Sequence, residues 1–235
     1  MTDQFTPSAF ISGASRGLGL ALACELAQQG WHLLINARGT KDLSKAATEL
    51  RQWTEVTAVA GDISDPDHRQ LLAEAAAKIG GLDVIINNAG ILGPSPQPAL
   101  LDYPLNSLTT VYQINVIAPL AILQTLYPHL RSGATIINVS SDAAVEAYPG
   151  WGGYGSSKAA LEQLTAVLAA ENPNIRFYWV DPGDMRTQMH QEAFPGEDIS
   201  DRPLPAASVP GFMALLTTNW PNGRYVAREL APQAV

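Results

Sequence analysis

The sequence is poor in charge. Only 15% of its 235 residues are Asp, Glu, Lys or Arg, against about a quarter in an average soluble domain, although its apolar content of 46% is ordinary. The 22 acidic residues outnumber the 14 basic ones. The resulting net charge of −8 argues against a nucleic-acid partner, because a phosphate backbone requires a basic face. The shortage of charge indicates a chain with much buried or shared surface.

Cysteine and uninterrupted apolar runs are scarce as well. The single cysteine, Cys24, excludes an intrachain disulfide and is expected to be a small core residue. No basic stretch followed by an apolar run opens the sequence, so we expect no secretory signal and a cytoplasmic location. Residues 105–130 lack charge, but polar residues and two prolines interrupt them. This stretch is therefore predicted to be a buried helix, and no membrane contact is expected.

Short apolar runs alternate with helical stretches along most of the chain. Strands are predicted at 9–12, 32–36, 57–60, 84–87, 135–139, 175–180 and 223–226. Helices are predicted at 17–29, 41–53, 66–79, 107–130, 154–170 and 208–216. The alternation predicts an α/β fold, a Rossmann-type doubly wound parallel sheet of about seven strands, in a single domain over 1–235. The proline-rich stretch 191–210 is predicted to be a loop that acts as a substrate lid.

A glycine-rich segment follows the first predicted strand and opens a helix. It reads Ser-Gly-Ala-Ser-Arg-Gly-Leu-Gly over residues 12–19. Glycines allow the backbone to approach a pyrophosphate closely, and a helix N-terminus offers free N–H groups to an anion. A glycine turn alone is equally compatible with a structural role. Its place between a strand and a helix favours nucleotide binding.

Tyr154 and Lys158 are four residues apart, on one face of a predicted helix. A free tyrosine has a pKa of about 10 and is a poor base at neutral pH, but a neighbouring ammonium lowers that pKa by favouring the phenolate. Such a pair can donate and accept a proton near neutral pH, although the same spacing occurs in helix-surface pairs. Ser141 precedes Tyr154 by 13 positions.

Together these segments resemble the short-chain dehydrogenase/reductase family, in its compact single-domain branch. The spacing Gly-x-x-x-Gly-x-Gly at 13–19, Asn-Asn-Ala-Gly at 87–90, the Ser/Tyr/Lys spacing and Pro-Gly-x-x-x-Thr at 182–187 carry the resemblance. It covers residues 8–190, and a shorter stretch at 171–176 is similar to sepiapterin reductases. The resemblance implies an oxidoreductase that interconverts a carbonyl and a secondary alcohol. The substrate itself stays open.

The resemblance also implies residue roles. Ser141 would bind the substrate oxygen, Tyr154 would be the general acid/base, and Lys158 would bind the nicotinamide ribose and tune the tyrosine. Asn115 would hold a water that links Lys158 to solvent. Pro119 has no N–H to bond the carbonyl of residue 115, which fits either that water or a plain kink. Cofactor contacts are expected for Gly13, Ser15, Arg16, Gly17, Leu18, Gly19, Arg38, Asp62, Ile63, Asn88, Ala89, Gly90, Tyr154, Lys158, Pro182, Gly183 and Thr187.

The end of the second predicted strand bears on the choice of dinucleotide. An NAD site of this fold usually places an acid there for the ribose 2′-hydroxyl, but this chain has Ala37 followed by Arg38. Arg16 and Arg38 can bind a 2′-phosphate through charge-assisted hydrogen bonds, unless both are ordinary surface arginines. NADP(H) is therefore favoured over NAD(H). The four histidines lack ligand spacing, so no metal site is expected. His190 follows the Pro-Gly segment and is expected on the surface, with a position facing the substrate as the alternative.

Two predicted helices are too apolar to face solvent. Residues 107–130 carry no charge, and 154–170 carry only Lys158 and Glu162. A homodimer or homotetramer is therefore expected, and the resemblance implies that these helices form the dimer interface. The alternative to an enzyme is a non-catalytic NADP-binding sensor or scaffold on the same fold. A third possibility, an epimerase or dehydratase, usually has a longer chain with a separate substrate domain.

Overall fold

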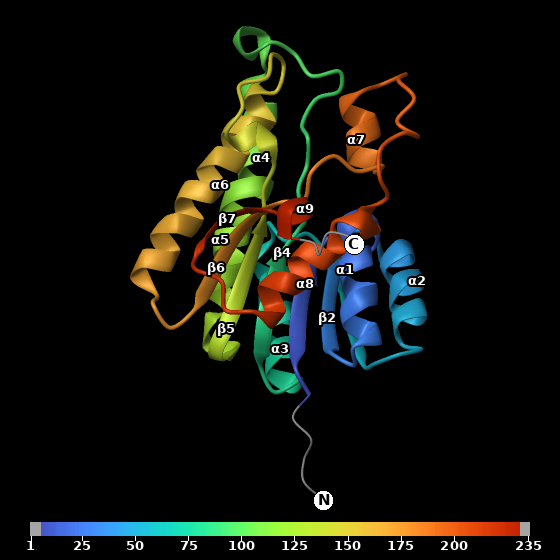
Figure 1. Cartoon of the computed structure of the whole chain (residues 1–235), viewed down its shortest axis with the longest axis vertical. Helices are drawn as coiled ribbons and strands as arrows, with labels where there is room; N and C mark the ends of the chain where they lie inside the picture. The colour runs from blue at the N-terminus through green and yellow to red at the C-terminus, as the bar shows by residue number, and fades with distance from the viewer. Residues whose placement is uncertain (1–5, 231–235) are drawn as a thin grey trace, which may run out of the picture.

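The computed structural model describes residues 6–230 as one parallel sheet between two layers of helices (Figure 1). Seven strands lie in the order β3-β2-β1-β4-β5-β6-β7, which confirms the predicted doubly wound fold. They are β1 (Ser8–Ser12), β2 (His32–Ala37), β3 (Val56–Ala60), β4 (Leu82–Asn87), β5 (Leu130–Val139), β6 (Arg176–Asp181) and β7 (Gly223–Val226). The order reverses between β1 and β4, and folds of this kind bind ligands at the carboxyl ends of the strands beside such a reversal.

Helices cover both faces of this sheet. One face is covered by α1 (Gly17–Gln28), α2 (Thr40–Leu50) and α8 (Val209–Thr217). The other is covered by α3 (Pro66–Lys78), α4 (Leu105–Tyr112), α5 (Ala118–Leu126) and α6 (Gly152–Glu171). Two short helices, α7 (Gln188–Ala193) and α9 (Ala227–Leu230), lie near the carboxyl ends of the strands.

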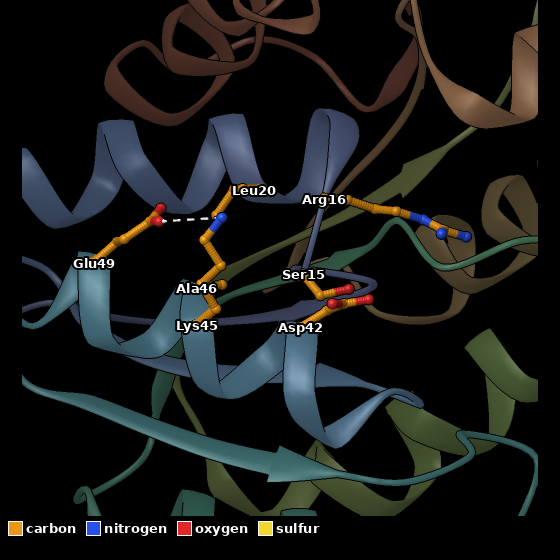
Figure 2. Close-up of a pocket in the computed structure, with 7 residues that line it drawn as sticks. All are labelled: Ser15, Arg16, Leu20, Asp42, Lys45, Ala46 and Glu49. Atoms are coloured by element: carbon orange, nitrogen blue, oxygen red, sulfur yellow. Dashed lines mark ion pairs between the residues drawn. The ribbon is translucent and has the colours of Figure 1, made fainter.

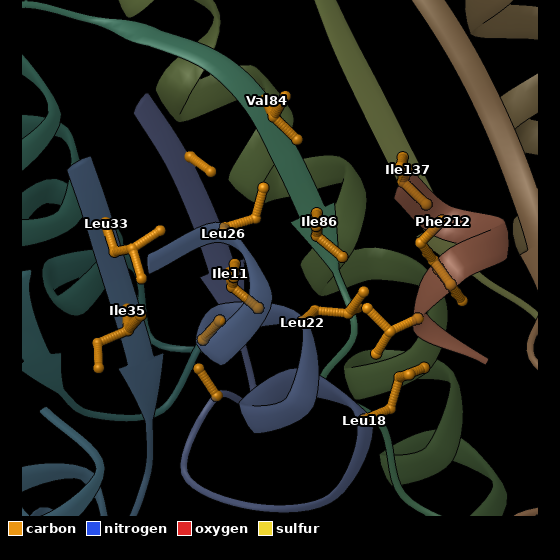
Figure 3. Close-up of a cluster of buried hydrophobic side chains, with 14 of the residues drawn as sticks. Ile11, Leu18, Leu22, Leu26, Leu33, Ile35, Val84, Ile86, Ile137 and Phe212 are labelled. Atoms are coloured by element: carbon orange, nitrogen blue, oxygen red, sulfur yellow. The ribbon is translucent and has the colours of Figure 1, made fainter. Parts of the chain in front are cut away.

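Two apolar layers hold the helices to the sheet. Ile11 of β1 faces the layer of α1 and α8, whereas Phe10 beside it faces the layer of α3 and α5. Figure 3 shows the first layer, in which Leu22 of α1 and Phe212 of α8 lie over the strands. Because both faces are covered, the strands are apolar on both sides, as continuous apolar runs in the sequence predict.

The helix predicted at 107–130 is not continuous. It consists of α4, a π-helical turn η2 (Gln113–Ile117), α5 and a 3-10 turn η3 (Tyr127–His129). Pro119 stands at the start of α5 and has no N–H to donate one turn back, and the turn before it widens to a bond from Ala118 N–H to the Gln113 carbonyl. The π-helical turn therefore contains Asn115, whose carbonyl Pro119 leaves without its usual helical bond.

Other boundaries differ by smaller amounts. β5 begins at Leu130 rather than at residue 135, because its exposed first half has no apolar pattern to predict it. Helix α2 ends at Leu50, and residues 51–53 form a turn. The stretch 191–210 is not all loop, since it contains the end of α7 and a 3-10 turn η5 (Pro205–Ala207).

Candidate functional site

The glycine loop after β1 has a backbone that favours glycine. Gly13 and Gly17 have φ angles of +69° and +58°, in the left-handed region. A side chain on Gly19 would collide with the Gly13 carbonyl and with Asn88. Helix α1 begins here, and no side chain among residues 6–230 caps its first turn at Arg16. The loop therefore leaves free backbone N–H groups at a helix N-terminus, which fits the pyrophosphate of a dinucleotide.

The segment after β4 fixes this loop in place. Asn88 Nδ2 donates to the carbonyls of Ser12 and Gly13 at 3.0 and 3.2 Å. Ser12 Oγ accepts from the backbone N–H groups of Asn88 and Ala89, at 3.1 Å each. Asn88 and Ala89 therefore hold the glycine loop against the sheet.

A surface pocket lies between α1 and α2, beside the glycine loop (Figure 2). A cavity of about 240 Å³ is lined by Ser15, Arg16, Leu20, Asp42, Lys45, Ala46 and Glu49. Arg16 points away from the Lys45–Glu49 ion pair (Figure 2), and its guanidinium donates to Gln188 Oε1 of α7. Arg16 thus already has a partner within the chain, which the sequence did not predict.

Arg38 and Asp62 come together at the same edge of the sheet. Burial raises the pKa of the Asp62 carboxyl, but hydrogen bonds from Ser64 and the charge of Arg38 outweigh it and leave that pKa below its ordinary value. The side chain of Ile63 is 4% exposed and packs in the core layer with α3. Of Arg38, Asp62 and Ile63, only the first two therefore have side chains that solvent can reach.

The four predicted catalytic residues gather at the carboxyl ends of β4 and β5. Lys158 Nζ lies 5.6 Å from the centre of the Tyr154 ring, and both side chains are buried. A Cβ at Gly90 would lie 3.2 Å from Asn115 Oδ1 and 3.6 Å from Lys158 Nζ. Because glycine has no side chain, the backbone of the loop after β4 can approach both groups closely. Ser141 follows β5 and is partly exposed.

Asn115 lies in the π-helical turn and is fully buried. Its Nδ2 donates to the Ile91 carbonyl at 2.9 Å and to Ser157 Oγ at 3.0 Å, and its Oδ1 accepts from Ile91 N–H at 2.9 Å. The side chain therefore ties the loop after β4 to α6. A relay water at this residue would have to bind its backbone carbonyl.

The two serines after β5 are used differently. Ser140 is 2% exposed, and its Oγ donates to Glu162 Oε1 at 2.5 Å. Ser141 faces the site, where its Oγ accepts from Ala143 N–H at 3.2 Å and donates to Asp142 Oδ1 at 2.9 Å. Of the two serines, Ser141 is the one that lies beside Tyr154.

The proton affinities correct one expectation. Burial lowers the pKa of Lys158 to about 8. Burial raises the pKa of Tyr154, the charges of Asp142 and Asp181 act in the same direction, and only a hydrogen bond between Tyr154 and Ser141 opposes them. The predicted lowering of the Tyr154 pKa by Lys158 is therefore wrong for the chain by itself. The pattern of residues revealed the lysine but neither the burial nor the two carboxylates.

Tyr154 lies beside a cluster of ring side chains that sequence reasoning missed. We call this cluster, made of Trp151, His190 and Phe194, the aromatic roof. The Trp151 ring lies 5.8 Å from the Tyr154 ring and 5.9 Å from Phe194, and His190 lies 4.9 Å from Phe194. The side chain of His190 is 10% exposed, so its expected surface position is wrong. Its Nε2 has no hydrogen-bond partner among the described residues. Part of this roof, Phe194, comes from the stretch predicted as a lid.

The Pro-Gly segment after β6 reaches the glycine loop. The methyl group of Thr187 lies 3.8 Å from the position of a Cβ on Gly17. Pro182 is held by a hydrogen bond of 2.7 Å from Ser208 Oγ to its carbonyl, and Gly183 has a φ of +73°. The guanidinium of Arg228 lies against Gly183, a contact across 45 positions that no local pattern indicates.

A glycine loop at the strand-order reversal, beside a partly exposed serine and buried Tyr, Lys and Asn side chains, defines the class of α/β oxidoreductases that use a nicotinamide dinucleotide. The chain belongs to the short-chain dehydrogenase/reductase family, because the family model described as short chain dehydrogenase matches residues 7–198. The single-domain Rossmann-type fold expected from the sequence resemblance is the fold of this family.

Several known proteins are similar over most of their length. Short chain dehydrogenase penD of Penicillium thymicola is 32% identical, over 94% of this chain and 89% of its own. Tropinone reductase-like 3 of Erythroxylum coca is 32% identical, over 81% and 74%. An alcohol dehydrogenase from the archaeon Thermococcus sibiricus, solved with 5-hydroxy-NADP, has a TM-score of 0.86 at 27% identity, over 98% of this chain and all (100%) of the other.

Within residues 6–230, no helix combines the length and the apolar character needed to cross a membrane. In the same part of the chain, no group of three His, Cys, Asp or Glu side chains is arranged to hold a metal ion.

Proposed function

We propose that the protein is an NADP(H)-dependent oxidoreductase that interconverts a carbonyl and a secondary alcohol in a small molecule. The observation that carries this proposal is the gathering of Ser141, Tyr154, Lys158 and Asn115 beside an uncapped helix N-terminus with a glycine loop. A sensor or scaffold needs the loop but not a buried tyrosine next to a buried lysine. The non-catalytic alternative is therefore the weaker one.

The cofactor would be held by residues that the structure brings to one edge of the sheet. The loop 13–19 and Thr187 fit the pyrophosphate, and Gly90 and Lys158 lie where the nicotinamide ribose would bind. Arg38, and Arg16 on release from Gln188, would meet the 2′-phosphate, which favours NADP(H) over NAD(H). When bound, the nicotinamide supplies or accepts a hydride.

The chain's own residues would manage the oxygen and its proton. Ser141 Oγ and the Tyr154 hydroxyl would bind the carbonyl oxygen together, and Tyr154 would give its proton to that oxygen during reduction. Burial keeps the phenol protonated, which suits a proton donor. Lys158, with a pKa of about 8, would return a proton to Tyr154 near neutral pH, and a water bound by the Asn115 carbonyl would pass a proton from solvent to Lys158.

The substrate would bind between Ser141 and the aromatic roof. Trp151 and Phe194 form an apolar surface beside Tyr154, which favours carbonyl compounds with an apolar group next to the C=O. The stretch 191–210 would then act as the lid, because it contributes Phe194 and would have to move to admit a substrate.

The test is an activity panel of aldehydes, ketones and quinones with NADPH and with NADH. We expect consumption of NADPH with at least one apolar ketone. Tyr154→Phe should lower kcat by roughly a hundredfold or more and leave NADPH binding, followed by fluorescence, unchanged. Tyr148→Phe removes an exposed phenol that donates to Asp142 and should keep its activity. NADPH binding without turnover on any member of the panel would instead establish the non-catalytic alternative.

A further inference from the structure

A charged network that the proposed mechanism does not use lies directly behind Ser141. Arg224 of β7 is at its centre. Its Nε donates to Glu162 Oε1 at 3.0 Å, and its Nη2 donates to the Ser141 carbonyl at 3.2 Å and to Asp181 Oδ2 at 3.3 Å. One guanidinium therefore connects β7 with the segment that follows β5, with the end of β6 and with α6.

Each partner of Arg224 stands next to a residue of the site. Glu162 lies one helical turn after Lys158 on α6. Asp181 ends β6 immediately before the Pro-Gly segment, and its Oδ1 accepts from Gly183 N–H at 2.8 Å. A shift of Arg224 would therefore be felt on three sides of the site.

The network is largely removed from water. The side chains of Asp181, Glu162 and Arg224 are 8%, 12% and 25% exposed. Carboxylates at such depth destabilise a fold unless they are paired and hydrogen-bonded. Apart from Arg224, Glu162 accepts from Ser140 Oγ, and Asp181 accepts from Gly183 N–H. Among these contacts, Arg224 is the cation shared by two carboxylates.

The charges of this network reach the catalytic pair. Burial lowers the pKa of Lys158, and the charge of Glu162 opposes that effect. Burial raises the pKa of Tyr154, as do Asp142 on the turn after β5 and Asp181 on β6. Burial and Asp142 also raise the pKa of Asp181, whereas the Gly183 N–H and Arg224 lower it. Asp142, Glu162 and Asp181 are thus charged groups that act on Tyr154 or Lys158, and Arg224 is bonded to two of them, Glu162 and Asp181.

We propose that Arg224 is a positioning residue of the active site: its guanidinium holds the Ser141 backbone and offsets the charges of Glu162 and Asp181, and so sets the field at Lys158 and Tyr154. The roles of Ser141, Tyr154 and Lys158 rest on the proposed function, whereas the contacts of Arg224 do not. Loss of Arg224 leaves uncompensated negative charge beside Lys158, which strengthens its hold on a proton. Loss of the Glu162 charge does the opposite.

The chain's low lysine content makes this measurable without cofactor or substrate. The sequence contains four lysines, so protein labelled with ¹³C at the lysine ε-carbon gives four signals. The spectrum of Lys158→Met identifies the signal of Lys158, and a pH titration then gives its pKa. We expect about 8 in the parent protein, a rise on the order of one pH unit in Arg224→Met and a fall in Glu162→Gln. Arg224→Lys keeps the charge and should stay near the parent value.

A matched control separates this effect from the loss of any arginine. Arg176 bonds Asn219 and the Gly133 carbonyl at the opposite end of β6, so Arg176→Met should leave the Lys158 titration unchanged. Opposite shifts in Arg224→Met and Glu162→Gln support the proposal, because a merely structural role gives no such pair of signs. Unchanged titrations, or shifts in one direction, overturn it. If Arg224→Met does not fold, Glu162→Gln and Arg224→Lys decide.

Turnover is the second readout. In the alcohol-oxidising direction the rate rises with pH as the acid/base pair loses its proton, and this limb should move to higher pH in Arg224→Met and to lower pH in Glu162→Gln. A parent protein that turns over no carbonyl or alcohol refutes the proposed function and leaves the lysine titration readable. A parent protein that is active, with the same Lys158 pKa throughout the series, refutes the role of Arg224 alone.

Discussion

Lys158 is a charged group placed almost completely out of water. Its side chain is buried, its Nζ donates to the Val139 carbonyl at 2.8 Å, and burial lowers its pKa to about 8 from an ordinary 10.5. Below pH 8 the folded protein therefore holds a buried ammonium that the unfolded chain keeps hydrated. Such a residue serves the site at the expense of stability, as functional residues often do.

Replacing this lysine should stabilise the fold and abolish turnover. At pH 7 we expect Lys158→Met to raise the free energy of unfolding by on the order of 1–3 kcal/mol, reduced by loss of the bond to Val139. Between about pH 8 and 10.5 the unfolded parent chain binds more protons than the folded one, so the stability of the parent protein rises with pH. The difference in free energy of unfolding between Lys158→Met and the parent therefore narrows over this range.

Urea unfolding of both proteins at pH 7 and pH 9.5 measures this difference. Lys45→Met is the control, because the side chain of Lys45 is 80% exposed and only reaches Glu49 at 4.0 Å. It should show no comparable change with pH. A Lys158→Met protein less stable than its parent at pH 7 would contradict the burial argument.

Arg38 should decide between the two dinucleotides. It is exposed, close enough to Asp62 to lower that carboxyl's pKa, and follows Ala37 where an NAD site usually has an acid. Arg38→Ala should weaken NADPH binding by about tenfold or more and leave NADH binding nearly unchanged, since only NADPH carries the 2′-phosphate. Fluorescence titration of both cofactors checks this, with Lys78→Ala as the control. Equal losses of affinity for NADPH and NADH would show that Arg38 does not contact the 2′-phosphate.

At the scale of the elements, local patterns predicted most of the fold. The final strand is observed at 223–226 as predicted, and α3 begins at Pro66 after Asp65, whose side chain accepts from Asp67 N–H. These signals are carried by neighbouring residues. Boundaries failed where tertiary contacts decide them, as in β5, which extends to Leu130 by pairing with Leu82 of β4.

The candidate site also combines features that local sequence patterns predict with features that depend on tertiary contacts. The glycine loop and the Ser/Tyr/Lys spacing could be read from the sequence, because each motif is short. The partners that give the site its electrostatics could not. Arg16 meets Gln188 across 172 positions, and Arg224 meets Glu162 across 62. Such residues become neighbours only when the whole chain folds, because they belong to different elements. A sequence pattern within one element therefore cannot predict these contacts.

Helix α6 is joined to the sheet by a buried polar chain as well as by apolar packing. Asn87 Nδ2 donates to Asn138 Oδ1 at 2.8 Å, and Asn138 Nδ2 donates to Thr165 Oγ1 at 2.7 Å. These hydrogen bonds link β4, β5 and α6. Ser141 follows the end of β5, and Tyr154 lies in the first turn of α6.

Asn138→Ala should remove both links at once. It leaves a buried amide and a buried hydroxyl short of a partner, so we expect the free energy of unfolding to fall by about 1–3 kcal/mol. Thr48→Ala, which removes an exposed hydroxyl bonded to the Ser44 carbonyl at 2.9 Å, should cost about 0.5 kcal/mol. Urea unfolding measures both. A loss in Asn138→Ala no larger than in Thr48→Ala would show that water replaces the missing amide.

At the scale of the whole molecule, apolar residues at two locations account for the low content of charged residues. The strands are apolar on both faces because helices cover both, which accounts for part of it. The second location is the outer layer of α4, α5 and α6, where large apolar side chains face solvent. Leu105, Ile117, Tyr127 and Val167 are 77%, 49%, 50% and 43% exposed in the single chain. Exposed apolar residues gathered in one layer indicate an interaction surface.

A second copy of the chain is the expected partner for that layer, as the sequence resemblance also implies. We expect light scattering at micromolar concentration to give the mass of a dimer or tetramer. Ile117→Glu combined with Val167→Glu should give a monomer, because two carboxylates cannot be buried in an apolar interface without partners. Trp53→Glu is the control, since Trp53 is 47% exposed after α2, on the opposite face of the sheet. A monomeric parent protein would contradict the prediction, and a double variant of unchanged mass would move the interface to another surface.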